Sequence, residues 1–232
     1  GDQYLANLFW KQGEYNTALN HQFRAREVFE ESGDAKLLSM SAATAGLIHM
    51  GLGNTERAYE EMQQALRLAR HGGFRYDEAT ILKNIGLIAV QEQDFPRARQ
   101  VFAEAVAIDT ALGYTRGLAY DYRNLGNVLV LSGMIPEGVS YLKKGLDLSA
   151  EIDDTRNLIQ CRLGLAGAQR RKGLLAEAAR QIEAGISLVS NAFMRGLEWR
   201  LYAEHARILR AQGAHDEAFG AYNRSLDVIE RM

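Results

Sequence analysis

The chain has 232 residues, of which 47% are hydrophobic, and its formal net charge is −2 at pH 7. This composition is that of a folded chain, and it lacks the broad basic excess that is typical of nucleic-acid-binding proteins. Residues 1–20 carry no signal-peptide pattern, and no apolar run reaches the ~20 residues that span a bilayer. The single cysteine, Cys161, cannot form an internal disulfide, which fits a reducing compartment. We therefore expect a cytoplasmic location, no membrane contact and no nucleic-acid partner.

A period of 40 residues runs through the chain. A turn residue recurs at this interval, and the positions seven before, five after and twelve after each turn hold only Ala, Gly or Ser. The turn residues are Gly13, Gly53, Gln93, Gly133, Gly173 and Gly213. Small residues at fixed positions allow helix backbones to approach closely, so each period is predicted to be one helical hairpin.

The segment 122–149 illustrates the predicted hairpin. Leu125 and Leu129 before the turn, and Leu142 and Leu146 after it, keep a spacing of four, and no stretch alternates with a period of two. The only two prolines, Pro96 and Pro136, stand three residues after a turn, where proline suits the first turn of a second helix. These patterns predict an all-α chain.

In chain order, the predicted units cover about residues 1–33, 34–73, 74–113, 114–153, 154–193 and 194–232. We expect an αL-type cap to end the second helix of the first four, at Gly33, Gly73, Gly113 and Asp153. Each repeat buries its apolar face only against its neighbours, so residues 1–232 are expected to form a single solenoid. The missing initiator Met and the uncapped terminal repeats suggest a segment of a larger protein. Self-association through these terminal repeats is also considered.

The pattern of Leu125-Gly126, Gly133, Gly138 and Gly145 resembles the tetratricopeptide repeat (TPR), with Gly in place of the last two Ala. The resemblance covers all six units, although 40 residues exceed the ~34 of the usual repeat. It is similar to the long-repeat branch that includes kinesin light chains, spindle-orientation adaptors and bacterial regulatory TPR arms. The resemblance implies a right-handed superhelical α-solenoid whose first helices line a concave groove.

No catalytic or metal-binding pattern accompanies the repeats. None of the five histidines pairs at i, i+4 with another, and the sequence has no phosphate-binding glycine loop and no nucleophile elbow. Acidic pairs such as Glu60-Glu61 are more typical of solvated surface than of a catalytic dyad. Cys161 is expected to be a half-buried core residue. We therefore expect no enzymatic activity and no cofactor.

The resemblance places groove positions thirteen, ten, nine, six and three residues before each turn. They are expected to be apolar near the N-terminus, amide-bearing in the middle and arginine-rich towards the C-terminus. The candidate peptide-binding residues are Lys83, Asn84, Tyr120, Arg123, Asn124, Asn127, Gln160, Arg170, Arg200, Arg207 and Arg210. Guanidinium groups bind carboxylates through two hydrogen bonds, which favours an acidic peptide or a C-terminal carboxylate.

An alternative interpretation stays open, in which these residues serve only solvation and helix packing. Arginines on long helices are often solvated or paired at i, i+4 with a carboxylate, as Arg200 with Glu204 would be. Gly164 and Gly167 either leave room for a ligand side chain or only permit close helix packing. Arg123, Asn127 and Arg200 occupy slots of the dicarboxylate clamp of chaperone-binding TPR domains, whereas Gly164 and Glu204 depart from that pattern.

Three functions are therefore considered. The first is a protein-interaction scaffold that binds a peptide or helical segment of a partner in its groove. The second is the sensor or regulatory arm of a larger bacterial protein, such as a transcription regulator or a peptidase-linked TPR protein. The third, nucleic-acid binding through the arginines, is disfavoured by the net charge of −2.

Overall fold

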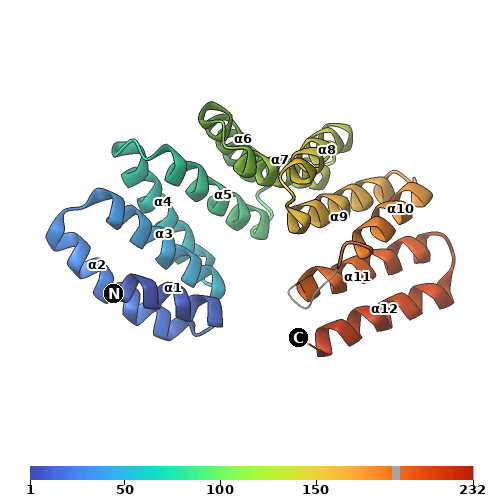
Figure 1. Cartoon of the computed structure of the whole chain (residues 1–232), viewed down its shortest axis with the longest axis horizontal. Helices are drawn as coiled ribbons and strands as arrows, with labels where there is room; N and C mark the ends of the chain where they lie inside the picture. Colours follow the sequence, from blue (N-terminus) through green and yellow to red (C-terminus); the bar gives the residue numbers. More distant parts are fainter. Residues whose placement is uncertain (190–193, 232) are drawn as a thin grey trace. The chain divides into compact units, whose positions relative to one another are not determined.

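The computed structural model describes residues 1–189 and 194–231, and all the regular structure in these ranges is α-helical, with one short 3₁₀ position before α11 (Figure 1). The predicted all-α helical-repeat solenoid is confirmed. The helices are α1 Asp2–Gln12, α2 Tyr15–Ser32, α3 Ala35–Gly51, α4 Thr55–His71, α5 Arg75–Gln91, α6 Phe95–Leu112, α7 Thr115–Leu131, α8 Ile135–Glu151, α9 Thr155–Arg171, α10 Leu175–Ile186, α11 Arg195–Ala211 and α12 His215–Glu230.

The 40-residue period reappears in the helix boundaries. Each second helix of a hairpin begins two residues after a turn residue, and Pro96 and Pro136 lie in the first turns of α6 and α8. The turn residues adopt positive φ, which closes the first helix with a left-handed cap, and Gln93 does so with φ 61°. Asp153, with φ 55°, takes the same conformation at the predicted cap after α8.

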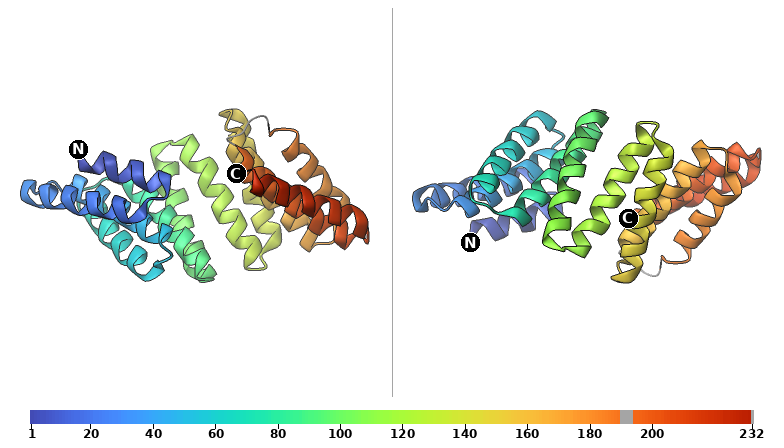
Figure 2. Two further views of the ribbon diagram at one scale, coloured as in Figure 1. Left: turned by 90° about the horizontal axis from the view of Figure 1, so that it is seen from below. Right: turned by 90° about the horizontal axis from the view of Figure 1, so that it is seen from above.

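Two compact units are present, Gly1–Gly113 and Tyr114–Met232, and in each the successive helices pack side by side (Figure 2). Small residues sit where the helices of a hairpin approach. A Cβ on Gly126 of α7 would lie 2.8 Å from Leu142 Cγ and 2.9 Å from the Gly138 carbonyl oxygen of α8. Gly86 of α5 is likewise covered by the ring of Phe102 from α6. The predicted close contacts therefore have a direct steric basis.

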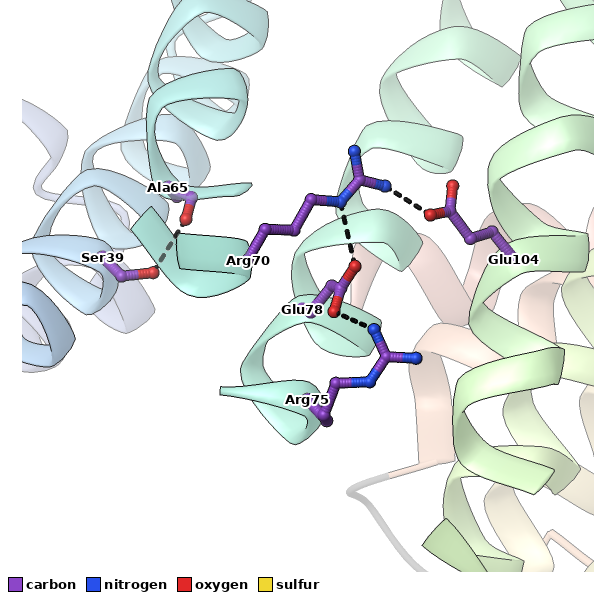
Figure 3. A network of polar contacts seen from close by, with 6 residues as sticks. All are labelled: Ser39, Ala65, Arg70, Arg75, Glu78 and Glu104. Carbon is purple, nitrogen blue, oxygen red and sulfur yellow. Dashed lines mark hydrogen bonds and ion pairs between the residues drawn. The ribbon is translucent and has the colours of Figure 1, made fainter. Parts of the chain in front are cut away.

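The first unit has an apolar core between its hairpins, which includes Met62, Leu82 and Ile85. A polar network spans three of its helices (Figure 3). Arg70, at the end of α4, donates from Nε to Glu78 Oε1 of α5 at 2.9 Å and also bonds Glu104 of α6. Glu78 is only 3% exposed, so its pairing with two arginines, Arg70 and Arg75, satisfies a carboxylate that burial would otherwise penalise. This network ties α4, α5 and α6 together.

Within the described residues, no helix is both long enough and apolar enough to cross a membrane, and no group of three or more His, Cys, Asp or Glu side chains is placed to hold a metal ion. Cys161, predicted to be half-buried, is instead completely buried in α9. Burial raises the pKa of its thiol to about 12, which keeps the sulfur protonated and unreactive near neutral pH.

Candidate functional site

The eleven candidate binding residues fall in both units, and each unit is considered by itself. Lys83 and Asn84 lie on α5 of the first unit. The remaining candidates belong to the second unit and lie on its first helices: Tyr120, Arg123, Asn124 and Asn127 on α7, Gln160 and Arg170 on α9, and Arg200, Arg207 and Arg210 on α11. Helix α9 contacts both α7 and α11, so the structure brings these nine residues onto neighbouring helices.

In the first unit, the candidate cation Lys83 already forms an ion pair within the protein. Lys83 Nζ lies 2.9 Å from Asp109 Oδ2 of α6, and the Asp109 side chain is completely buried. Removing a charge partner from a buried carboxylate costs several kcal/mol, so this ion pair is a fixed part of the α5–α6 packing. Asn84 is half-buried beside it on α5.

Arg123 of α7 is held in a different way. Its Nη1 donates to Asn157 Oδ1 of α9 at 2.6 Å, and its Nε and Nη2 donate to Asn124 Oδ1 at 3.3 and 2.9 Å. Its guanidinium also lies 5.1 Å from the centre of the Tyr120 ring. All of these partners are neutral. A guanidinium has five N–H donors, so this arrangement fixes the group while leaving donors for a ligand.

Comparison of successive repeats shows why Arg123 lacks a carboxylate. Arg123 occupies the same repeat position as Lys83, ten residues before the turn. The position that supplies Asp109 to Lys83 holds Ser149 in the next repeat. Ser149 Oγ accepts from Asn157 Nδ2 at 2.8 Å, so a neutral network replaces the ion pair. The positive charge of Arg123 is therefore retained, whereas that of Lys83 is cancelled.

Burial lowers the pKa of Arg123 below its usual range, and the nearby charge of Arg200 lowers the pKa further. The neighbouring Tyr120 hydroxyl donates to Asp154 Oδ2 at 2.9 Å. Burial and this hydrogen bond raise the pKa of Tyr120, so its hydroxyl stays protonated. The region around Arg123 is thus an incompletely solvated positive site, in which an incoming carboxylate would be bound more strongly than in water.

On α9 and α11, a single carboxylate engages two arginines. Glu204 Oε1 lies 2.7 Å from Arg170 Nε, and Glu204 Oε2 lies 3.0 Å from Arg207 Nη1. The Glu204 side chain is 8% exposed and that of Arg170 29%, so Arg170 is partly buried against this carboxylate. The expected pairing of Glu204 with Arg200 is wrong, because the carboxylate turns towards α9 instead.

Arg200 and Arg210 are the freely accessible cations of this face. Both are exposed on α11, and neither makes an ion pair or hydrogen bond within the described part of the chain. Their solvated guanidinium groups can approach a ligand without breaking a contact of the folded protein.

The two glycines of α9 have different surroundings. A Cβ on Gly164 would lie 2.7 Å from Leu142 Cδ2 and would overlap the Asn127 amide oxygen, so Gly164 serves close packing and leaves no room for a ligand. Within the described part of the chain, a Cβ on Gly167 would have one neighbour within 4 Å outside its own helix backbone, Glu204 Oε1 at 3.8 Å. Of the two expected openings, the structure keeps the one at Gly167. Gln160 lies half-buried on the same helix, about two turns before Gly167.

Three polar residues of this face are absent from the sequence-based set: Asn157, Asp154 and Glu204. Each is contacted by a candidate residue 34 positions earlier, namely Arg123, Tyr120 and Arg170. In a 40-residue repeat, a separation of 34 joins the first helices of adjacent hairpins. A search for polar pairs at this separation could have found all three.

Comparison with known families matches residues 37–111 to the tetratricopeptide repeat. No curated protein sequence matches the chain. Many solved structures share its fold, and their low sequence identity shows likeness of fold alone.

Three of these structures illustrate the kinds of protein that share the fold. The first is a signal transduction ATPase with numerous domains (STAND) with a TPR sensor from Pyrococcus horikoshii, with a TM-score of 0.79, 16% identity, and coverage of 97% of this chain and 36% of that one. The second is the Rap conjugation gene regulator of plasmid pLS20 in complex with the Phr* peptide. It has a TM-score of 0.75 and 14% identity, and the match covers 99% of this chain and 61% of that one. The third comprises kinesin light chain TPR-like repeats from Podosopora anserina. It has a TM-score of 0.67 and 15% identity, and the match covers 81% of this chain and 92% of that one. The chain thus spans about a third of the STAND protein and under two thirds of the Rap regulator.

Proposed function

The chain carries tetratricopeptide repeats, as the resemblance predicted, and on this basis we propose that it is a protein-interaction scaffold that binds an acidic peptide segment of a partner. The binding face consists of α7, α9 and α11 of the second unit. Its function is recognition, with no catalytic step.

The observation that carries this proposal is the imbalance of charge on that face. Arg123 is fixed by neutral amides, while Arg200 and Arg210 are exposed without a carboxylate partner. Elsewhere in the described chain, the half-buried cations Arg26 and Lys83 each contact a carboxylate, whereas Arg162 contacts the Gln181 amide. A partner segment with acidic side chains or a C-terminal carboxylate would supply the missing charges and form charge-assisted hydrogen bonds.

The proposal is tested by selecting binders from a displayed peptide library on the purified protein. We expect enrichment of acidic sequences, and at least about a tenfold loss of affinity for them in the Arg200→Glu/Arg210→Glu variant, because each reversal replaces an attraction by a repulsion. These positions are preferable to Arg170 and Arg207, whose reversal would place two new carboxylates against the buried Glu204.

A matched control is Arg180→Glu/Arg224→Glu, which makes the same change in net charge at exposed positions on α10 and α12. Both variants should melt at the temperature of the wild type. Equal losses in the two variants would reduce the effect to net charge, and selection without acidic enrichment would refute the proposed ligand class.

A second candidate function is a sensor or regulatory arm, in which the bound segment changes the state of an attached effector. Its support is the likeness of fold to a STAND protein with a TPR sensor and to a Rap gene regulator bound to a peptide. This function requires that ligand binding alter amide hydrogen exchange in helices that do not contact the ligand, whereas a passive scaffold requires protection only on α7, α9 and α11.

A further inference from the structure

One carboxylate, Glu204, lies among the arginines of the second unit. It receives one hydrogen bond from Arg170 and one from Arg207, at separate oxygens. Each carboxylate oxygen can accept about two hydrogen bonds, so both oxygens retain the capacity to accept from a ligand. Because the side chain is 8% exposed, its charge is screened less by solvent than that of a surface carboxylate.

The space over Gly167 lies next to this carboxylate. Among the described residues, and apart from the backbone of α9 itself, the only atom within 4 Å of a Cβ built there is Glu204 Oε1, at 3.8 Å. One turn earlier, the corresponding space at Gly164 is filled by Leu142 and Asn127. A ligand group that enters over Gly167 therefore meets a carboxylate oxygen that also accepts from Arg170 Nε at 2.7 Å.

Exposed cations stand on either side of Glu204 along α11. Arg200 precedes it by four residues and Arg210 follows it by six. The rise of an α-helix is 1.5 Å per residue, so these two arginines are about 15 Å apart along the axis. An extended peptide covers this distance in about five residues. Arg207, which is 53% exposed and paired with Glu204, lies between Glu204 and Arg210, so the order of charges along α11 is positive, negative, positive, positive.

We propose that the space over Gly167 is a subsite for a carboxamide side chain, Asn or Gln, within a segment whose acidic groups bind Arg200 and Arg210. The carboxamide N–H donates to Glu204 Oε1. A carboxylate there would oppose Glu204 in a poorly solvated place, and an ammonium would meet Arg170 and Arg207, so a neutral donor fits best. This inference rests on the proposed function and specifies its ligand.

The test uses three fluorescent hexapeptides with blocked termini. Each has aspartate at both ends and serine at the second and fifth positions, and the two central residues are asparagine, aspartate or leucine. By fluorescence anisotropy, the wild type should bind the asparagine peptide about tenfold to a hundredfold more tightly than either of the others, as one charge-assisted hydrogen bond would give. The aspartate peptide should bind more weakly than the asparagine peptide, although it carries two additional negative charges.

Two variants report on the subsite itself. Glu204→Gln should reverse the order and make the aspartate peptide the tighter ligand, because Arg170 and Arg207 then lose their internal carboxylate. Gly167→Leu should remove the difference between the asparagine and leucine peptides by filling the space. Gly220→Leu on α12, where a Cβ has no neighbour within 4 Å among the described residues outside its own helix backbone, is the matched control and should leave the peptide affinities unchanged.

The comparison of peptides on the wild type does not require any variant to fold, and melting curves check the variants. If the wild type prefers the aspartate peptide and Glu204→Gln leaves this order unchanged, the carboxamide subsite is refuted while binding of acidic segments stands. If no hexapeptide binds and the Arg200→Glu/Arg210→Glu variant leaves library selection unchanged, the proposed function fails and this inference fails with it.

Discussion

At the scale of single residues, close packing sets the identity of Gly126. Its α-carbon faces Leu142 and the backbone of Gly138, with no room for a methyl group. We expect Gly126→Ala to lower the free energy of unfolding by ~1–3 kcal/mol, since an extra carbon must displace backbone atoms. Urea denaturation followed by circular dichroism measures this change.

Gly220 provides the control for this prediction. It also lies within a helix, but a Cβ there meets no atom of the described residues within 4 Å apart from its own helix backbone. Gly220→Ala should stabilise the protein by ~0.5–1 kcal/mol, because alanine loses less backbone entropy on folding. Equal effects of the two substitutions would show that helix propensity alone, and not the α7–α8 contact, determines the result.

At the scale of elements, each hairpin depends on a left-handed residue between its two helices. Gln93 fills this position in the third repeat with φ 61°, where five other repeats have glycine. A residue with a side chain pays ~1–2 kcal/mol to adopt this conformation. Glycine avoids that cost but loses more backbone entropy on folding, which offsets part of the difference. We expect Gln93→Gly to raise the free energy of unfolding by up to about 1 kcal/mol, measured by urea denaturation.

The reciprocal substitution, Gly133→Gln, tests the same turn in the next repeat, where φ is 83° and a Cβ would meet no non-adjacent atom of the described residues within 4 Å. It should destabilise the protein by a similar amount. A loss of stability on Gln93→Gly would mean that the glutamine side chain contributes interactions that outweigh its backbone strain.

The elements also show which features a sequence can predict. The period carried by residues such as Gly13 and Gly133 predicts where the hairpins turn, because a left-handed cap and a close helix contact each demand a small residue. The spacing of small residues does not determine the direction of the Glu204 side chain, which only a comparison of polar pairs between adjacent repeats would have indicated. A partner four residues away on the same helix and a partner on α9 are both within reach, and packing between the helices decides in favour of Arg170.

At the scale of the whole molecule, the arginines of the second unit are offset by acidic residues elsewhere. The chain has 27 Lys and Arg against 29 Asp and Glu, so its long-range field is not that of a polyanion-binding protein. The proposed recognition is therefore local and depends on a few guanidinium groups at defined positions. Nucleic acids, which bind mainly through broad neutralisation of phosphates, should be poor ligands.

We predict that a labelled 20-nucleotide single strand binds at least about tenfold more weakly than the acidic hexapeptide with central asparagines, in the same buffer at ~100 mM salt. Anisotropy titrations at several salt concentrations measure both. Each phosphate contact steepens the slope of log K against log salt by about 0.7 for a single strand, so a few adventitious contacts give a shallow slope. A tight complex with a slope steeper than about −3, weakened by Arg200→Glu/Arg210→Glu, would instead assign this face to nucleic acid.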